Sequence, residues 1–320
     1  MKALVTGGAG FIGSHFVRRL LSESDVLEVT VLDSLSYAGN IENLSEFTSD
    51  SRFEFVKGDI NDIKLVEHLI QGKSHIVNLA AESHVDRSIS DSDNFVTTNI
   101  LGTHTLLKAA KVVGDIRFLQ VSTDEVYGSI NQGEWDEDCS LLPNSPYSAS
   151  KASADLLVRS FFTTHGLDAV ITRCSNNFGP YQFPEKLIPI SIIRLLEGKN
   201  IRIYGNGLNV RDWLHVTDHC EGIYLALRNG KRGSVYNFGA GAERSNLEIA
   251  QAILKRLNLK SDRIEFIEDR KGHDFRYSVT FAKAQQELGF APKVNFDEGM
   301  SGTIDWYLSN EHWWRRALRT

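Results

Sequence analysis

The sequence is poor in several features that mark other classes of protein. Its 320 residues include only three cysteines and six prolines, and its formal net charge is −6. A negative charge argues against a nucleic-acid partner held by a general basic surface. Cys139, Cys174 and Cys220 have no CxxC spacing. We therefore expect free thiols in a reducing compartment, and neither a disulfide framework nor a zinc or other metal site.

Long hydrophobic runs are also missing. No apolar stretch approaches the roughly 20 residues that a membrane-spanning helix needs. The first residues follow a strand pattern and lack the apolar region of a signal peptide. We expect a cytoplasmic protein with no membrane partner. Its composition, 42% hydrophobic and 24% charged, is that of a globular chain long enough for one large core and a smaller lobe.

Short apolar runs alternate with helix-length amphipathic segments over the first two-thirds of the chain. This alternation predicts an α/β fold with a doubly wound parallel sheet. The expected strands are 3–6, 29–32, 52–56, 75–80, 117–122 and 168–173, and the expected helices are 11–21, 63–70, 96–113 and 146–165. We place the sheet domain in residues 1–174 and a smaller mixed α/β lobe in 175–320, with parts of 205–240 returning to the sheet.

A glycine-rich loop lies between the first expected strand and the first helix. Gly7, Gly10 and Gly13 have the GxxGxxG spacing of a Rossmann dinucleotide site. We assign Gly7 to the tight turn, Gly10 to close approach of the pyrophosphate and Gly13 to helix packing, with Phe11 and Ile12 between them. The helix N-terminus adds free N–H groups for the phosphates. A lone glycine pattern is weak, but here strand, loop and helix follow in order.

The identity of the dinucleotide depends on the end of the second strand. Asp33 is placed to accept hydrogen bonds from the adenosine ribose, and no arginine occurs among Ser34, Leu35, Ser36 and the tyrosine after them. A 2′-phosphate would meet repulsion there, so we predict NAD as the cofactor. Asp59 and Ile60 follow the third strand and would flank the adenine, although Asp59 is equally suited to cap a helix.

Tyr147 and Lys151 are four residues apart on an expected helix and therefore share a face. A tyrosine is a poor base at neutral pH. A nearby ammonium and a positive nicotinamide ring would favour the phenolate and lower its pKa. The alternative is a surface tyrosine and a solvated lysine without a catalytic role. It is less favoured here because a NAD-binding motif precedes the pair in the same chain.

The run Thr123-Asp124-Glu125 ends a strand at the edge where such sheets bind ligands. The hydroxyl of Thr123 is placed to hydrogen-bond the substrate oxygen whose carbon is oxidised. A reaction that only moved hydride would need no further acid and base, whereas two carboxyl groups in one site push their pKa values apart. The alternative is that one of the two is a cap or a loop residue.

These motifs resemble those of nucleoside-diphosphate-glucose 4,6-dehydratases in the extended short-chain dehydrogenase/reductase superfamily, most of all the dTDP-glucose enzymes. The resemblance runs from Met1 to about Trp314. It is carried by GGAGFIGSH, LAAESHVDRS, STDEVYG, YSASKA, CSNNFGPYQFPEKLIP, RDWLHVTDH and DRKGHDFRY. It implies that Thr123, Tyr147 and Lys151 oxidise C4 of the sugar, that Asp124 is the acid and Glu125 the base for loss of water between C5 and C6, and that hydride then returns to C6.

The resemblance also implies less specific assignments. Leu79, Ala80, Ala81, Ser83, Thr98 and Asn177 would border the cofactor. Ser83, Thr123, Asn176, Glu185, Lys186, Leu187, Arg202, Tyr204, Arg211, Asn246, Arg270 and His273 would contact a nucleotide sugar such as dTDP-glucose. Arginines suit a diphosphate because guanidinium groups bind it in two-pronged fashion, although a surface ion pair is the ordinary alternative. A homodimer formed through helices 96–113 and 148–162 is expected from the same resemblance.

Other functions stay open at this stage. A sugar-nucleotide C4 epimerase or decarboxylase would share the fold, but the adjacent Asp124 and Glu125 argue against it. A 4,6-dehydratase acting on UDP-glucose differs only in the nucleotide base, which the sequence does not decide. A non-catalytic NAD-binding protein would be expected to have lost Tyr147 or Lys151, and this chain has both.

Overall fold

A seven-stranded parallel sheet forms the centre of the computed structural model, which describes residues 1–318. Its strand order is β10-β6-β5-β4-β1-β2-β3, and every neighbouring pair is parallel. The strands are β1 (Lys2–Thr6), β2 (Glu28–Asp33), β3 (Phe53–Lys57), β4 (His75–Asn78), β5 (Arg117–Thr123), β6 (Asp168–Cys174) and β10 (Val235–Phe238). The order reverses between β1 and β4, which places a ligand site at the carboxyl ends of these strands.

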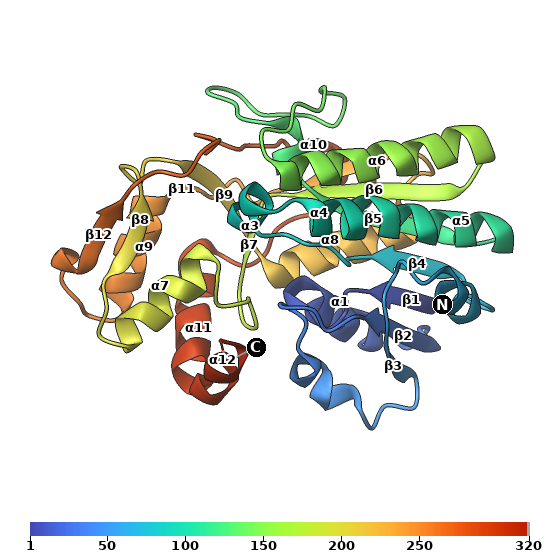
Figure 1. Ribbon diagram of the computed structural model, residues 1–320, viewed down its shortest axis with the longest axis horizontal. Helices are drawn as coiled ribbons and strands as arrows, with labels where there is room; N and C mark the ends of the chain where they lie inside the picture. The colour runs from blue at the N-terminus through green and yellow to red at the C-terminus, as the bar shows by residue number, and fades with distance from the viewer. Residues whose placement is uncertain (319–320) are drawn as a thin grey trace.

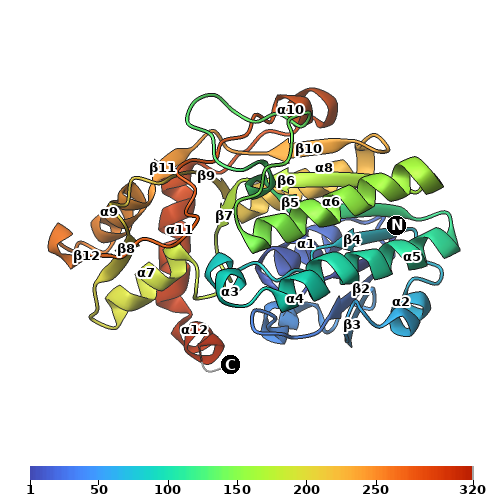
Figure 2. The same ribbon diagram turned by 45° about the horizontal axis from the view of Figure 1, so that its top comes forward.

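Helices cover both faces of this sheet. In Figure 2, α5 (Thr103–Val113) and α6 (Pro146–His165) lie in front of it, while α1 (Phe11–Leu21) and α8 (Val216–Asn229) lie behind. The front face also carries α2 (Ile63–Leu69). Two apolar clusters, one on each face, fill the space between strands and helices. The predicted doubly wound α/β fold is confirmed.

A smaller mixed lobe stands beside the sheet, on the left of Figure 1. It has a three-stranded sheet, β11-β9-β7, and a two-stranded parallel sheet, β12-β8. Its elements are β7 (Asn176–Phe178), α7 (Leu187–Leu196), β8 (Ile201–Tyr204), β9 (Val210–His215), β11 (Glu243–Ser245), α9 (Asn246–Arg256), β12 (Ile264–Ile267), α11 (Phe296–Ser309) and α12 (Glu311–Ala317). Its apolar core includes Trp313 and Trp314, with Trp306 packed against it.

The chain passes repeatedly between sheet and lobe. After β9 it returns to cover the sheet with α8 and to add β10, and then it leaves again for β11. Later, α10 (Ala282–Leu288) packs near β10 and α8 before the chain ends in the lobe. The boundary at residues 174 and 175 stays a prediction. Within residues 1–318, no helix is both long enough and apolar enough to cross a bilayer.

The helix expected over 96–113 differs in its first half. After the short α3 (Val85–Ser90) and α4 (Asp93–Phe95), residues Val96–Gly102 form a π-helical turn, and α5 begins only at Thr103. The buried Asn99 on this turn bonds the backbone of Glu82 through both side-chain atoms and also donates to Ser150 Oγ. Such wide turns occur often at functional sites. Hydrophobic periodicity does not reveal them.

Candidate active site

A cavity of about 610 Å³ lies at the carboxyl edge of the parallel sheet. Residues that directly follow β1, β2, β4, β5 and β6 line it, as expected for a doubly wound sheet. Most residues that the sequence assigned to the cofactor face this cavity. They are Gly7, Gly10, Phe11, Ile12, Gly13, Asp33, Ser34, Ser36, Asp59, Ile60, Leu79, Ala80, Ala81, Ser83, Thr98 and Asn177.

The glycine loop has no room for side chains. Gly7 has φ +69°, and a Cβ on it would lie 2.6 Å from the backbone nitrogen of Ala80. A Cβ on Gly13 would lie 2.1 Å from the carbonyl oxygen of Gly7. Gly13 therefore packs its helix against the loop itself. Within residues 1–318, no side chain caps the start of α1, so its first N–H groups are available to a phosphate.

The end of β2 suits a ribose. Asp33 is buried, and its two carboxylate oxygens accept from the backbone N–H groups of Ala9, at 2.9 Å, and of Leu35, at 2.8 Å. Burial raises the pKa of Asp33. Leu35 supports this aspartate through its backbone and is not among the residues that line the cavity. Asp59 lines it, and the N-cap of α2 is Asp62, so the capping alternative for Asp59 is wrong.

Thr123, Asp124 and Glu125 lie where β5 ends in a 3₁₀ turn (Asp124–Tyr127), and all three line the cavity. The hydroxyl of Thr123 caps this turn by accepting from the backbone N–H of Glu125 at 3.2 Å. The same hydroxyl lies 3.3 Å from a carboxylate oxygen of Asp124. Asp124 is buried and Glu125 is partly buried. The alternative of an exposed loop carboxylate therefore fits neither residue.

The surroundings distinguish the two carboxyl groups. Burial, followed by the charge of Glu125, raises the pKa of Asp124 well above its usual range. Burial also raises the pKa of Glu125, but Arg270, Arg211 and Lys186 oppose that rise. Burial thus favours the protonated form of Asp124, while the three cations favour the ionised form of Glu125. This division suits an acid and a base acting in one site.

Tyr147 and Lys151 are placed by the start of α6. Ser145 and Ser148 form a reciprocal capping box, which fixes the first turn of the helix. Tyr147 and Lys151 both line the cavity, and the ammonium of Lys151 donates to the carbonyl of Val121 at 2.7 Å. The bland alternative of an exposed pair does not hold, because both side chains are buried.

The electrostatics of Tyr147 differ from the expectation. Burial, followed by the carboxyl of Glu125, raises the pKa of the phenol well above its usual value, and burial lowers the pKa of Lys151. The groups of this chain therefore disfavour the phenolate. A positive charge on a bound molecule, such as an oxidised nicotinamide ring, would favour it.

Besides Ser83, three further residues from the sequence assignment line the cavity: Asn176, Glu185 and Lys186. The ammonium of Lys186 donates to the carbonyl of Ser83 at 2.8 Å. Asn177 is held from behind, since its side-chain oxygen lies 2.8 Å from Nδ1 of the buried His219. Residues from both the sheet domain and the lobe thus form the walls of the cavity.

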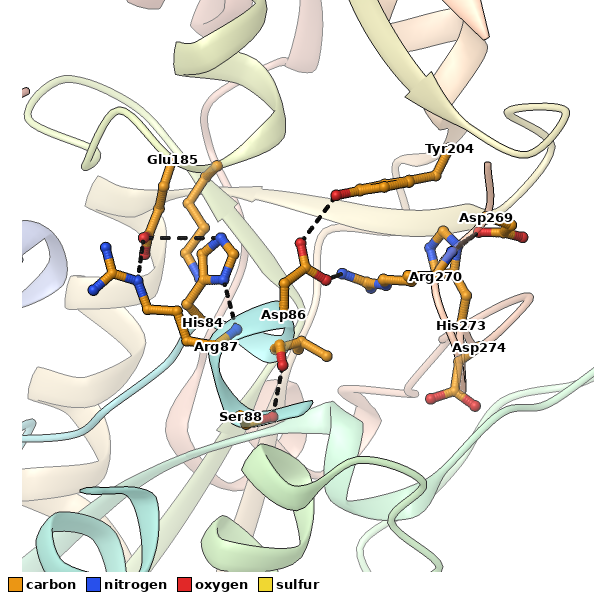
Figure 3. Close-up of polar contacts among 12 residues, drawn as sticks. His84, Asp86, Arg87, Ser88, Glu185, Tyr204, Asp269, Arg270, His273 and Asp274 are labelled. Carbon is orange, nitrogen blue, oxygen red and sulfur yellow. Dashed lines mark hydrogen bonds and ion pairs between the residues drawn. The ribbon is translucent and has the colours of Figure 1, made fainter. Parts of the chain in front are cut away.

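A second polar group lies between α3 and the lobe, as Figure 3 shows. Asp86 accepts from the hydroxyl of Tyr204 at 3.2 Å and pairs with Nη1 of Arg270 at 3.4 Å. His273 lies 2.6 Å from Asp269. Arg211 donates to the carbonyls of Asp274 and Phe275, and its guanidinium lies 4.4 Å from the centre of the Tyr277 ring.

Some residues that the sequence assigned to the nucleotide sugar do not line the cavity. Arg202 is exposed and pairs with Glu265 of β12 at 3.4 Å, which fits the surface alternative for an arginine. Leu187 and Asn246 begin α7 and α9 and are absent from the described lining of the cavity.

Several residues of the site are not evident from the sequence. Tyr37, Glu82 and Phe183 line the cavity, and Asp86 and Arg87 contact residues assigned to it. Glu82, Asp86 and Arg87 lie within the LAAESHVDRS motif, so their position after a strand was a usable signal. Asp86 and Arg87 pair with Arg270 and Glu185, which lie about a hundred residues or more away in sequence. His84 and His215 cap α3 and α8, where their side chains accept from backbone N–H groups. Among residues 1–318, no group of three or more His, Cys, Asp or Glu is arranged to hold a metal ion.

Comparison with known proteins places the chain among sugar-nucleotide dehydratases. A family model described as GDP-mannose 4,6 dehydratase matches residues 4–303. A protein of Actinoplanes sp. named dTDP-glucose 4,6-dehydratase is 52% identical over 319 residues, which cover 98% of this chain and 100% of that protein.

Solved structures agree. DesIV, a dTDP-glucose 4,6-dehydratase from Streptomyces venezuelae crystallised with NAD and TYD bound, has a TM-score of 0.98 at 50% identity, covering 99% of this chain and 100% of that one. A UDP-glucuronic acid 4-epimerase from Bacillus cereus, in complex with UDP-glucuronic acid and NAD, has a TM-score of 0.91 at 30% identity, covering 97% and 99%. The fold is thus shared with epimerases, while the sequence is more similar to the dehydratases.

Proposed function

The chain belongs to the GDP-mannose 4,6 dehydratase family, and on that basis we propose that it is an NAD-dependent hydro-lyase that converts dTDP-glucose into dTDP-4-keto-6-deoxyglucose. The proposed function rests on one observation, which is that two sets of residues line the same cavity. One set is the dinucleotide loop, and the other is Thr123, Asp124, Glu125, Tyr147 and Lys151. The dehydratases named above are similar to this chain over nearly its whole length.

The residues present fit NAD. The cradle at Gly7 and Gly13 leaves no space for a Cβ, the start of α1 offers N–H groups to a pyrophosphate, and the Asp33 carboxylate lines the same cavity. Lys151 and Asn177 would hold the nicotinamide end. NAD held there would supply the redox chemistry, as acceptor of a hydride from C4 of the sugar and donor of a hydride to C6.

Oxidation at C4 requires removal of the hydroxyl proton. The phenol oxygen of Tyr147 receives that proton, while the Thr123 hydroxyl holds the same sugar oxygen. Lys151 lies one helical turn beyond Tyr147 and is fixed by the carbonyl of Val121. The raised pKa of the phenol makes Tyr147 a base only when a positive charge lies beside it.

Elimination of water follows from the new ketone, which makes the proton on C5 acidic. Glu125 removes this proton, and Asp124 gives its own proton to the C6 hydroxyl, which leaves as water. The assignment follows from the surroundings described above, because burial favours the protonated form of Asp124 and the nearby cations favour the ionised form of Glu125. C5 is then reprotonated, and the sugar becomes a 4-keto-6-deoxy sugar.

The nucleotide diphosphate is the natural ligand for the cationic groups on the lobe side. Lys186 lines the cavity together with Glu125, and the charges of Arg270, Arg211 and Lys186 act to lower the pKa of the Glu125 carboxyl. Tyr204, His273 and Asn246 would complete this subsite, and Leu187 would border it. Preference for dTDP over UDP rests on the similarity to dTDP-glucose enzymes.

The C4 epimerase alternative is disfavoured, because an epimerase has no water to eliminate and no need for an acid beside a base. One labelling experiment separates the two functions. With dTDP-glucose deuterated at C4, the label should appear in the new C6 methyl group, with no net consumption of NAD. Loss of label to solvent, or recovery of a C4 epimer, would contradict the proposal. Parallel incubations with dTDP-, UDP-, GDP- and CDP-glucose would show which nucleotide base the enzyme accepts.

Two further properties are proposed from the same similarity. The chain would act in the cytoplasm, where Cys139, Cys174 and Cys220, all free here, would stay reduced. It would also pair with a second copy through α5 and α6, which lie side by side in Figure 2. Leu101, Val112 and Leu156, on or next to these helices, expose 51%, 77% and 55% of their surface, as expected of an apolar face that a partner covers.

A further inference from the structure

Three segments that are distant in sequence meet at the outer side of the cofactor cavity. Tyr37 follows β2, Arg87 belongs to α3, and Glu185 precedes α7. The guanidinium of Arg87 lies 3.9 Å from the centre of the Tyr37 ring, and its Nε lies 3.3 Å from a carboxylate oxygen of Glu185. Figure 3 shows the contact between Arg87 and Glu185. These two contacts connect loops of the sheet domain to the lobe.

The arrangement places Arg87 behind the cavity wall. Tyr37 and Glu185 line the cavity, as does Phe183, whose ring meets that of Tyr37 edge-on at 5.5 Å. Arg87 is not among the described lining residues, and half of its side chain is exposed. It therefore covers the wall from the solvent side and holds Tyr37 and Glu185 together.

The charges around Glu185 favour its pairing with Arg87. The side chain of Glu185 is 13% exposed, and burial raises the pKa of its carboxyl, while Lys186 and Arg87 oppose that rise. His84 lies 3.8 Å from the same carboxylate, but burial lowers the pKa of His84 to about 4, so it is neutral near pH 7. Arg87 is thus the cation that pairs with Glu185 at working pH.

We propose that Arg87 is a positioning residue that retains the cofactor, by closing the wall formed by Tyr37, Phe183 and Glu185. This inference rests on the proposed function and explains one of its requirements. The reaction ends with the cofactor in its starting oxidation state. A cofactor that escaped after oxidation at C4 would leave the sugar stranded as a ketone. A wall held by side chains from three segments delays escape without touching the reacting atoms.

The test measures cofactor exchange in the absence of sugar. Purified holoprotein is mixed with isotopically labelled NAD, and the bound label is followed by rapid filtration. Arg87→Ala should exchange its cofactor about 10-fold faster than the wild type, since it loses a cation–π contact and an ion pair. Arg87→Lys keeps the charge but loses the planar stack, so its exchange should be intermediate. The exposed Arg202, paired with Glu265, provides the matched control, and Arg202→Ala should exchange at the wild-type rate.

A second measurement distinguishes retention from catalysis. Activity of Arg87→Ala should fall on dilution and return to the wild-type kcat when excess NAD is added. Wild-type exchange in Arg87→Ala would overturn the inference, as would a low kcat that NAD does not restore. A wild-type chain that takes up no NAD would overturn the proposed function itself, and that failure is distinct from unchanged exchange.

Discussion

Two adjacent carboxyl groups at the end of β5 differ because their neighbours differ. Asp124 is buried beside another acid, whereas Glu125 is reached by three cations from the lobe. Burial therefore favours the protonated form of Asp124, whereas the cations favour the ionised form of Glu125. Neighbouring residues of the same chemical type acquire opposite roles in this way.

Replacing Glu125 by glutamine should separate the two halves of the reaction. The change keeps the size of the side chain but removes the base, so overall turnover should fall by about 10²–10⁴-fold. Oxidation at C4 should persist in part, seen as near-ultraviolet absorbance of bound cofactor in a single turnover. Glu67→Gln, at an exposed position on α2, is the control and should be silent. Equal loss of both half-reactions would count against Glu125 as the base.

The pH dependence of turnover should respond to Arg270. This guanidinium lowers the pKa of Glu125, which must be ionised to act as a base. In Arg270→Gln the pKa of Glu125 should rise, so the acidic limb of the kcat profile should move to higher pH at saturating sugar nucleotide. Arg202→Gln removes a cation that pairs with Glu265 instead and should leave the limb in place. A shift to lower pH in Arg270→Gln would contradict this electrostatic assignment.

Sequence alone was sufficient to name the residues at the ends of strands, because motif and strand position point to the same edge of the sheet. Thr123, Asp124 and Gly7 belong to this group. Arg87 and Tyr37 could not be found in the same way, since their contact joins positions 50 residues apart through side chains only. Arg202 is the opposite case. It was assigned to the nucleotide sugar by resemblance, but it lies at the surface and pairs with Glu265.

At the level of elements, helix α11 offers a paired test of packing. A Cβ added to Gly302 would meet no atom within 4 Å, whereas one on Gly299 would lie 3.0 Å from Val294 and 3.1 Å from the ring of Phe178. Gly302→Ala should therefore gain about 0.5–1 kcal/mol from helix propensity. Gly299→Ala should be less stable than wild type, because the cost of overpacking exceeds the gain in helix propensity. Thermal midpoints should rank Gly302→Ala above wild type and Gly299→Ala below it; equal midpoints for the two variants would refute the packing argument.

The long periodic elements were predictable, and the short ones were not. Helix α6 was expected over 146–165 and is found there, because its capping box, proline and length all agree. Strands β7 and β11 have three residues each, too few for an alternating pattern to register. The π-helical turn at Val96–Gly102 depends on the buried hydrogen bonds of Asn99 with Glu82 and Ser150, which are tertiary contacts.

For the whole molecule, the proposed pairing of two copies can be tested on α6. Leu156→Glu places a charge on the exposed apolar face and should shift the wild-type dimer to monomers in sedimentation velocity. Leu308→Glu, on an exposed position of α11, is the matched helical control and should sediment as the wild type does. A wild-type chain that sediments as a monomer at micromolar concentration would end this proposal.

The threading of the chain between sheet and lobe has a consequence for how it can be cut. Val216, Ile223 and Leu227 of α8 belong to the apolar cluster that covers one face of the sheet, together with Phe16 and Leu20 of α1. A fragment ending at residue 174 would lack that cover and also the edge strand β10. Such a fragment would carry a bare hydrophobic surface into solution and aggregate. Grafting this nucleotide-binding half onto another enzyme would therefore require the second half to travel with it.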